Sequence, residues 1–287
     1  MELQTLSSSI VQNFIPTRKS TSRKGDNGIV LVVGGSYIYH GAPVLSSLAA
    51  LRCGTDLVYT CVPKINVTPT RAISPNLIVI PLVDQKLTLG AVKKLVGALP
   101  RNLHSATIGM GLAIQEKNSL LHLVKSLLDR DVRLSLDASA LIPEILPILA
   151  HKNVVVTPHA GEFKRLFGDV PSDSNLERIK LVEENALKHG ITILLKGPTD
   201  IISDGKITYL CEKNTPAMTV GGTGDVLSGL VAGLLSTNRN TLESAAAASY
   251  ICGLAGKEVQ EKLGLHITSM DLIDSIPSVM KPFDKII

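Results

Sequence analysis

The stretch Ile29-Val30-Leu31-Val32-Val33, followed by Gly34-Gly35-Ser36, indicates the fold class of this chain. A continuous apolar run rich in β-branched residues is typical of a strand that is buried on both faces, as in a parallel sheet covered by helices. The glycines end the strand, and small residues with helical spacing follow from about Ala42 to Cys53. The stretch therefore predicts the first strand–helix unit of an α/β protein.

Strand and helix patterns alternate along the rest of the chain. Further strands are predicted over residues 56–62, 77–82, 106–108, 132–136, 153–156, 191–195, 200–203 and 206–211, the last two joined by the hairpin signal Asp204-Gly205. Further helices are predicted over residues 89–99, 116–129, 175–189, 223–237, 241–263 and 269–280. Gly253 and Gly256 are expected to break or soften the helix over 241–263.

This alternation predicts a three-layer α/β fold, with a mostly parallel central sheet and helices on both faces. We expect one domain over residues 1–287, in which residues 1–25 form a helical or extended addition. The alanine-rich segment 244–255 fits either the core or a subunit interface.

Nearly every predicted strand ends in glycine and polar residues. The motifs are Gly34-Gly35-Ser36, Gly109-Met110-Gly111, Asp137-Ala138-Ser139, the segment 157–162 and the segment 196–200. Each has a simple structural explanation alone, since Asp137 would serve as a helix cap and His159 as a hydrogen-bonded core residue. Together they predict a ligand site at the carboxyl edge of the sheet, where open parallel sheets bind ligands. No comparable polar signal is seen for the opposite edge.

The segment Val220-Gly221-Gly222-Thr223-Gly224-Asp225 runs directly into a helical pattern. Glycines let backbone N–H groups approach a ligand closely, and a helix N-terminus adds unpaired N–H groups and a positive dipole end. The segment predicts an anion hole for phosphate, with Asp225 as a base that takes a proton from a reacting hydroxyl. The alternative is a glycine-rich turn with a stabilising acid in the first turn of a helix.

Composition limits the partners. The 287 residues carry a formal net charge of +4, with 3% aromatic residues and no tryptophan, so we expect no nucleic-acid partner. No apolar run approaches the length of a membrane span, and residues 1–16 do not read as a signal peptide. Cys53, Cys61, Cys211 and Cys252 are expected to be reduced core cysteines of a cytoplasmic protein.

From about Lys24 to Pro282 the chain resembles the ADP- or ATP-dependent NAD(P)H-hydrate dehydratases, a branch of the ribokinase-like superfamily. The resemblance rests on these motifs, in this order: Lys24-Gly25-Asp26-Asn27-Gly28, Gly34-Gly35-Ser36, Gly41-Ala42-Pro43, Gly109-Met110-Gly111-Leu112, Leu136-Asp137-Ala138, Thr157-Pro158-His159-Ala160-Gly161-Glu162, Leu195-Lys196-Gly197 and Gly221-Gly222-Thr223-Gly224-Asp225. Members of the family usually have proline where Met110 and Ala160 stand, which puts only local loop shape in doubt. They often carry a fused epimerase domain, and we expect this chain to be the dehydratase alone.

The resemblance implies repair of NADH or NADPH that is hydrated at the nicotinamide ring, in the (S) form. A nucleotide, with ADP the expected donor, phosphorylates the ring hydroxyl, and loss of phosphate restores the reduced cofactor. Asp225 would be the catalytic base, and the hydrate site would be lined by Ala42, Gly111, His159 and Asp225. The nucleotide would contact Lys196, Gly197, Pro198, Thr199, Asp200, Gly222, Thr223 and Gly224. Glu162 would help to hold Mg²⁺ through water, and the protein would be a homo-oligomer, often a tetramer in this family.

Two other functions remain open at this point. A ribokinase-like kinase of a small vitamin-precursor alcohol, such as a hydroxymethylpyrimidine or a thiazole, would share the anion hole and the base. A nucleotide-sensing module would keep the site for binding alone, although the presence of Asp225 favours an enzyme.

Overall fold

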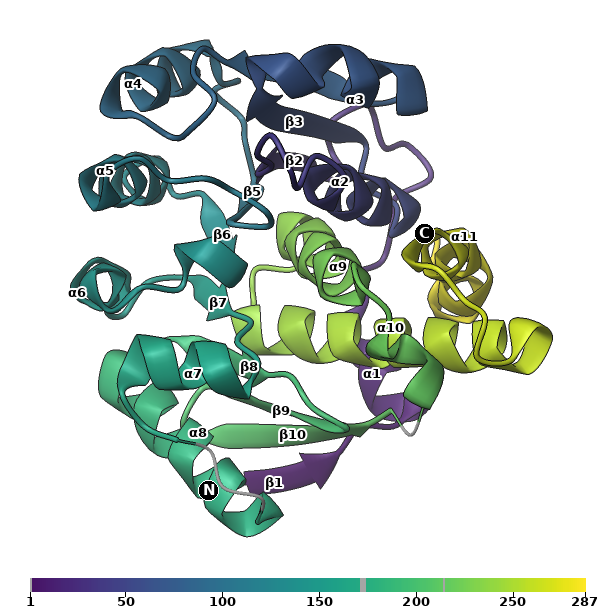
Figure 1. Ribbon diagram of the computed structural model, residues 1–287. Coiled ribbons are helices and arrows are strands. Elements are labelled where there is room, and N and C mark those ends of the chain that lie inside the picture. The colour runs from purple at the N-terminus through teal and green to yellow at the C-terminus, as the bar shows by residue number, and fades with distance from the viewer. Residues whose placement is uncertain (1, 171–173, 214) are drawn as a thin grey trace.

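The computed structural model describes residues 2–170, 174–213 and 215–287. Within these residues, ten strands form one sheet in the order β1-β10-β9-β8-β7-β6-β5-β2-β3-β4 (Figure 1). The strands are β1 (Glu2–Thr5), β2 (Ile29–Val33), β3 (Leu57–Pro63), β4 (Ile78–Leu82), β5 (Ser105–Ile108), β6 (Arg133–Leu136), β7 (Val154–Val156), β8 (Thr192–Leu195), β9 (Thr199–Ser203) and β10 (Ile207–Glu212). All pairs are parallel except those that β9 makes with β8 and β10. The predicted mostly parallel sheet and the hairpin of β9 and β10 are thus confirmed.

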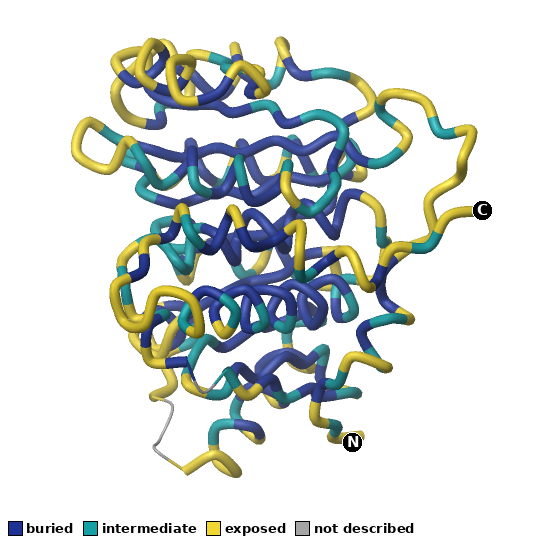
Figure 2. Tube along the Cα trace, turned by 90° about the vertical axis from the view of Figure 1, so that its right-hand side faces the viewer, coloured by how far each residue is buried: buried dark blue, intermediate teal, exposed yellow. Residues whose placement is uncertain are grey.

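The helices of the described residues cover both faces of this sheet. They are α1 (Ser8–Phe14), α2 (Ala42–Arg52), α3 (Val67–Ile73), α4 (Leu89–Ala98), α5 (Lys117–Leu128), α6 (Leu146–Leu149), α7 (Ala160–Phe167), α8 (Asn175–His189), α9 (Thr223–Thr237), α10 (Thr241–Leu263) and α11 (Ser269–Met280). Helices α2, α9, α10 and α11 gather on one face, and α4, α5, α6 and α8 lie on the other (Figure 1). Between them the sheet is buried, while most of the exposed residues lie in loops and on the outer faces of helices (Figure 2).

Strand β2 shows why the sequence folds in this way. All five of its residues are buried. Leu31 and Val33 belong to the hydrophobic core on the α4–α5 side, whereas Val30 and Val32 belong to the core that includes Ala50 of α2. Because neighbouring side chains of a strand point to opposite faces, an uninterrupted apolar run is what a sheet covered on both sides requires.

Helix α10 corrects one expectation. It is continuous through Gly253 and Gly256 rather than broken there. A Cβ atom on Gly256 would lie 2.3 Å from Sδ of Met218, and one on Gly253 would lie 3.6 Å from Cγ of Lys213. Gly256 therefore leaves room for Met218 to pack against the helix. The alanine-rich segment 244–255 is mostly buried within the chain, so it belongs to the core.

The N-terminal residues are part of the fold. Strand β1 pairs with β10, and α1 packs against α10. The ring of Phe14 contacts that of Tyr209 at a centroid distance of 5.5 Å, and Arg18 forms a backbone bridge with Ile286. The expected addition thus supplies an edge strand, which the sequence pattern did not reveal.

The cysteines and the hydropathy of the helices bear on two expectations from composition. The four cysteines are free, and all except the partly exposed Cys53 are buried. Across the described ranges, no helix combines the length and the hydropathy that crossing a membrane would need.

Candidate active site

The N-terminus of α9 lies at the carboxyl edge of the sheet and has no side-chain cap. Its N-cap residue, Gly222, has φ +95°, and a Cβ there would lie 2.6 Å from both Leu45 and Ser269. Gly221 is different, because among the described residues a Cβ on it would meet no atom within 4 Å, and one on Gly224 would meet only Nζ of Lys196 at 3.7 Å. Unpaired N–H groups therefore border open space beside an ammonium group, which is the arrangement an anion hole needs.

Asp225 lies in the first turn of this helix. Its backbone carbonyl accepts a hydrogen bond from Oγ of Ser46 in α2, at 2.7 Å. Burial, reinforced by the carboxylate of Asp137, raises the pKa of Asp225 to about 7, and Lys196 opposes this shift. A carboxyl group that titrates near neutral pH is suited to act as a general base.

Lys196, directly after β8, carries the positive charge of the site. Its Nζ lies 2.8 Å from Oδ1 of Asp137 and 3.5 Å from Oε2 of Glu162. Burial by itself would lower the pKa of Lys196, but the two carboxylates raise it overall, so the ammonium stays charged. Thr157 donates to the same oxygen of Asp137 at 2.9 Å. The ends of β6, β7 and β8 thus meet, as the strand-end motifs predicted.

Asp137 belongs to a strand-end motif that predicted the site, but the sequence assigned it no role of its own there. The sequence offered a helix-cap explanation, yet its side chain makes no cap hydrogen bond to the short helix that follows. It is 2% exposed and pairs with Lys196 instead. Its position at the end of a buried strand was the available signal, but the distance to Lys196 depends on how β6 and β8 are placed in the sheet.

His159 and Glu162 begin α7 as a capping box. Nδ1 of His159 accepts from the backbone N–H groups of Gly161 and Glu162, while Oε2 of Glu162 accepts from the N–H of His159 at 2.9 Å. The His159 side chain is 60% exposed, so it is not a core histidine. Because Nδ1 is an acceptor, the ring carries a proton on Nε2, which lies 3.5 Å from Oε1 of Glu162.

Ala42 and Gly111 lie next to each other at the start of α2. Gly111 has φ +61°, and a Cβ on it would lie 2.9 Å from the carbonyl oxygen of Tyr39 and 3.3 Å from Cβ of Ala42. Glycine is therefore required here for backbone reasons. Ser46, one turn after Ala42, contacts the backbone of Asp225, so the predicted hydrate-site residues of α2 and α9 lie close together.

A cavity of about 540 Å³ opens beside the anion hole. Among the residues predicted to bind nucleotide, it is lined by Lys196, Gly197, Pro198, Thr223 and Gly224. It is also lined by residues that the sequence did not suggest, namely Lys213, Thr215, Pro216, Met218, Thr219 and Leu227. The volume suits a small-molecule ligand.

Thr199 and Asp200 do not line this cavity. Asp200 is fully buried, and its oxygens accept from the N–H of Gly197, from Oγ of Ser249 and from Nζ of Lys213. Its side chain therefore shapes the loop that carries Lys196 and Gly197 rather than facing a ligand.

We expect Gly256→Ala to weaken nucleotide binding by about three- to tenfold. The added methyl group needs the space of Met218 Sδ, so Met218 would move toward the cavity that it lines, and overpacking of this kind is poorly tolerated. Isothermal titration calorimetry with ADP measures the effect. Gly253→Ala, on the same helix with ordinary clearance, is the control, and equal affinities of the two variants would contradict the prediction.

Because the pKa of Asp225 is raised, the free energy of unfolding is expected to depend on pH. The folded protein holds the proton of the Asp225 carboxyl group more tightly than the unfolded chain does. The stabilisation that this proton gives to the folded state is therefore complete below about pH 4 and is lost as the pH rises to about 7. We expect Asp225→Asn to raise the free energy of unfolding, relative to the natural chain, by about 1–3 kcal/mol more at pH 8 than near pH 4.5. Urea unfolding at both pH values measures this, and a difference independent of pH would argue against the raised pKa.

Comparison with known proteins identifies the family. The family model described as NAD(P)H-hydrate dehydratase matches residues 30–278. This chain belongs to that family. The NAD(P)H-hydrate dehydratase match covers the strands and helices that build the site described above.

Individual relatives agree with this membership. The chain is 79% identical over 286 residues to the "ADP-dependent (S)-NAD(P)H-hydrate dehydratase" of Nitrosopumilus maritimus, with 100% of both chains covered. It is 65% identical to the protein of the same name from Cenarchaeum symbiosum, with 96% of each covered. Among solved structures, the ADP/ATP-dependent NAD(P)H-hydrate dehydratase of Bacillus subtilis, co-crystallised with ATP and Mg²⁺, has a TM-score of 0.85 at 26% identity, covering 99% of this chain and 100% of that one. These likenesses confirm the expected ribokinase-like fold.

Proposed function

We propose that this protein uses ADP to dehydrate the (S) form of hydrated NADH or NADPH and so restores the reduced cofactor. One observation carries the proposal: Asp225, Lys196 and the uncapped N-terminus of α9 lie together. The pKa of Asp225 is near 7. The relatives with 79% and 65% identity carry the name of this activity.

The reaction divides into two steps that suit these groups. Asp225 takes the proton of the ring hydroxyl as its oxygen bonds to the terminal phosphorus of ADP, and AMP leaves with the electrons of the broken P–O bond. The C–O bond to the phosphorylated oxygen then breaks, so phosphate leaves in place of hydroxide, and loss of a proton from the adjacent ring carbon restores the double bond. Because phosphate is a far better leaving group than hydroxide, phosphorylation is what makes the elimination feasible.

The surrounding residues would hold the charge that moves during the transfer. The N–H groups of residues 222–224 would donate to the oxygens of the transferring phosphoryl group, and Lys196 would supply a fixed positive charge beside them. The cavity lined by Pro198, Met218 and Leu227 would take the nucleoside, while Ala42, Gly111 and His159 would border the hydrate.

The residues fit Mg²⁺ that is bound mainly by the nucleotide. Within the described ranges, no three His, Cys, Asp or Glu side chains come together closely enough to hold a metal ion. Glu162 is nevertheless placed beside Lys196, with an oxygen able to hold a metal-bound water, and Mg²⁺ commonly combines one or two carboxylates with substrate phosphates. Bound there, the ion would neutralise phosphate charge.

We further propose that the protein works in the cytoplasm as a homo-oligomer. The four free cysteines support a reducing compartment. Light scattering coupled to size-exclusion chromatography would test the assembly, and a mass equal to one chain would contradict it.

The test of the function is recovery of absorbance in the reduced-nicotinamide band. Purified protein, Mg²⁺ and hydrated NADH or NADPH are mixed, and ADP or ATP is added in separate samples. Recovery that depends on nucleotide is expected, faster with ADP. If folded protein binds nucleotide but restores nothing with either donor, the proposal fails, and phosphorylation of a hydroxymethylpyrimidine or thiazole alcohol would identify a kinase.

A further inference from the structure

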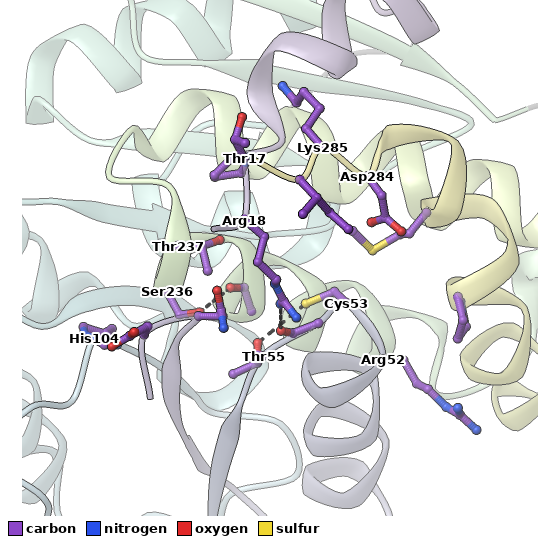
Figure 3. A pocket seen from close by; sticks show the side chains of 18 of the residues that line it. Thr17, Arg18, Arg52, Cys53, Thr55, His104, Ser236, Thr237, Asp284 and Lys285 are labelled. Atoms are coloured by element: carbon purple, nitrogen blue, oxygen red, sulfur yellow. Dashed lines mark hydrogen bonds between the residues drawn. The ribbon is translucent and has the colours of Figure 1, made fainter. Parts of the chain in front are cut away.

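A second cavity, of about 570 Å³, lies at the opposite edge of the sheet. The sequence analysis found no comparable polar signal at this edge, but the structure shows charged and polar side chains around the cavity there. The cavity forms where residues 16–18, the end of α2, the end of α9 and the C-terminal segment meet (Figure 3). These segments are distant in sequence, and the bridge between Arg18 and Ile286 joins two of them.

The charges around this cavity are unbalanced. Six arginines and lysines line it, against two aspartates. Two of the six cations interact with groups of the protein itself: Arg52 pairs with Asp274 at 3.5 Å, and Lys285 donates to the carbonyl of Gln12. Within the part of the chain that the structure describes, no carboxylate lies within 4.0 Å of Arg18, Arg133 or Arg239.

The burial of Arg133 raises the free-energy cost of this excess of positive charge. Arg133 is only 9% exposed, and its guanidinium donates to the backbone carbonyls of His104 and Ser236. Burial, followed by repulsion from Arg239, lowers its pKa, and the carboxylate of Asp131 opposes this shift only in part. A buried arginine that lines the same cavity as a second arginine needs a further negative partner, because a charge removed from water is stabilised only by compensation.

Hydrogen bonds to carbonyl groups near the ends of α2 and α9 explain part of the positions of Arg18 and Arg133. Arg18 extends toward the loop after α2, where it donates to the carbonyl of Gly54 (Figure 3), and Arg133 donates to Ser236 near the end of α9. Each bond uses one of the five N–H donors of a guanidinium, so both arginines keep donors for a ligand. These hydrogen bonds do not explain why Arg239 lines the same cavity as Arg133.

His104 adds a neutral donor. Its Nδ1 accepts the backbone N–H of Ile29 at 3.0 Å, which fixes the proton on Nε2. Burial, with the charges of Arg133 and Arg239, lowers its pKa, so the ring is neutral at pH 7. Two arginines and a histidine N–H lining one cavity form a set of donors that matches the oxygens of phosphate.

We propose that this second cavity binds a small oxyanion with at least two negative charges, either free phosphate species or the phosphate group of a nucleotide. The site is separate from the anion hole of α9, which lies at the other edge of the sheet. Its ligand would relieve the repulsion between Arg133 and Arg239 and would link the two ends of the chain to α2 and α9.

Calorimetric titration with pyrophosphate and, separately, with AMP tests the proposal. The experiment uses Gly224→Val protein, so that binding at the anion hole of α9 is suppressed. Saturable binding is expected, with the tighter of the two probes identifying free phosphate or a nucleotide as the source. Absence of saturable binding by both probes would overturn the proposal.

A second variant locates the binding. Arg239 is exposed, so Arg239→Ala in the same background is expected to fold and to weaken binding by at least about tenfold, the scale of a lost charge-assisted contact. Arg101→Ala, at an exposed arginine outside the cavity, is the matched control and is expected to bind normally. A rise in the pKa of His104 on adding pyrophosphate, followed by NMR, gives independent support. Equal affinities of the Arg239 and Arg101 variants would show that the anion binds elsewhere.

Discussion

Asp225→Asn is expected to lower the turnover number for nucleotide-dependent dehydration by at least about 100-fold, the usual scale for a lost general base. Asparagine keeps the size of the side chain and its place in the first turn of α9, but it cannot take a proton. ADP affinity should stay within about tenfold, because the N–H groups of α9 and the ammonium of Lys196 remain. Initial rates of absorbance recovery, with ADP affinity measured separately, test both parts.

A matched variant separates catalysis from helix stabilisation. Asp271 is also an acid in the first turn of a helix, α11, but it serves the capping box that begins with Thr268. If Asp225 only stabilised its helix, Asp225→Asn and Asp271→Asn would have similar small effects, of about 0.3–1 kcal/mol on stability, and neither would change turnover. Near-normal turnover in Asp225→Asn would remove the residue from its role as base.

Gly224→Val is expected to weaken ADP binding by at least about 100-fold without preventing folding. The side chain would stand where the backbone N–H groups meet the phosphates, and losing two charge-assisted hydrogen bonds is worth a factor of this size. Folding should survive, because in the part of the chain that the structure describes a Cβ at this position comes within 4 Å only of Nζ of Lys196, at 3.7 Å. Calorimetry with ADP and thermal unfolding measure the two effects.

The control for this variant is Gly97→Val. Gly97 also lies in a helix, α4, where a Cβ would meet no atom of the described residues within 4 Å, so the backbone change is the same but lies outside the proposed phosphate site. It should bind ADP as the natural chain does. If Gly224→Val also bound ADP with unchanged affinity, the N-terminus of α9 would not be the phosphate site. Gly222 is unsuitable for this test, since its φ of +95° and its contacts with Leu45 and Ser269 make any side chain disruptive.

Local sequence patterns were sufficient for most elements. The bounds of α8, α9, α10 and α11 follow the predicted ranges, because each helix has a clear start or stop signal, such as Gly190 at the end of α8. Local patterns failed to predict the structure where a residue or strand packs against a partner that is distant in sequence. Gly256 resembles a helix breaker in sequence, yet it is there because Met218 packs against α10. Strand β1 was missed because its partner, β10, lies more than 200 residues away.

The candidate site was predicted in outline for a similar reason. Strand-end residues of a parallel sheet must gather at one edge, so Lys196 and Glu162 could be placed together before their distances were known, and the family resemblance added Asp225 to them. Which of them touch could not be predicted. Asp200 stood in the same motif as Lys196, but the hairpin of β9 and β10 buries it against Lys213 and Ser249.

By itself, the sequence determined the alternation of strands and helices, the glycine-rich turn before α9 and the presence of one acid beside it, because these depend on residues close together in the chain. Only the tertiary structure decided that Asp137 would lie against Lys196 and help to raise the pKa of Asp225, and that Arg133 and Arg239 would line one cavity at the sheet's other edge. The physical reason is that charge interactions depend on distance and burial, and both are set by how the strands are ordered in the sheet.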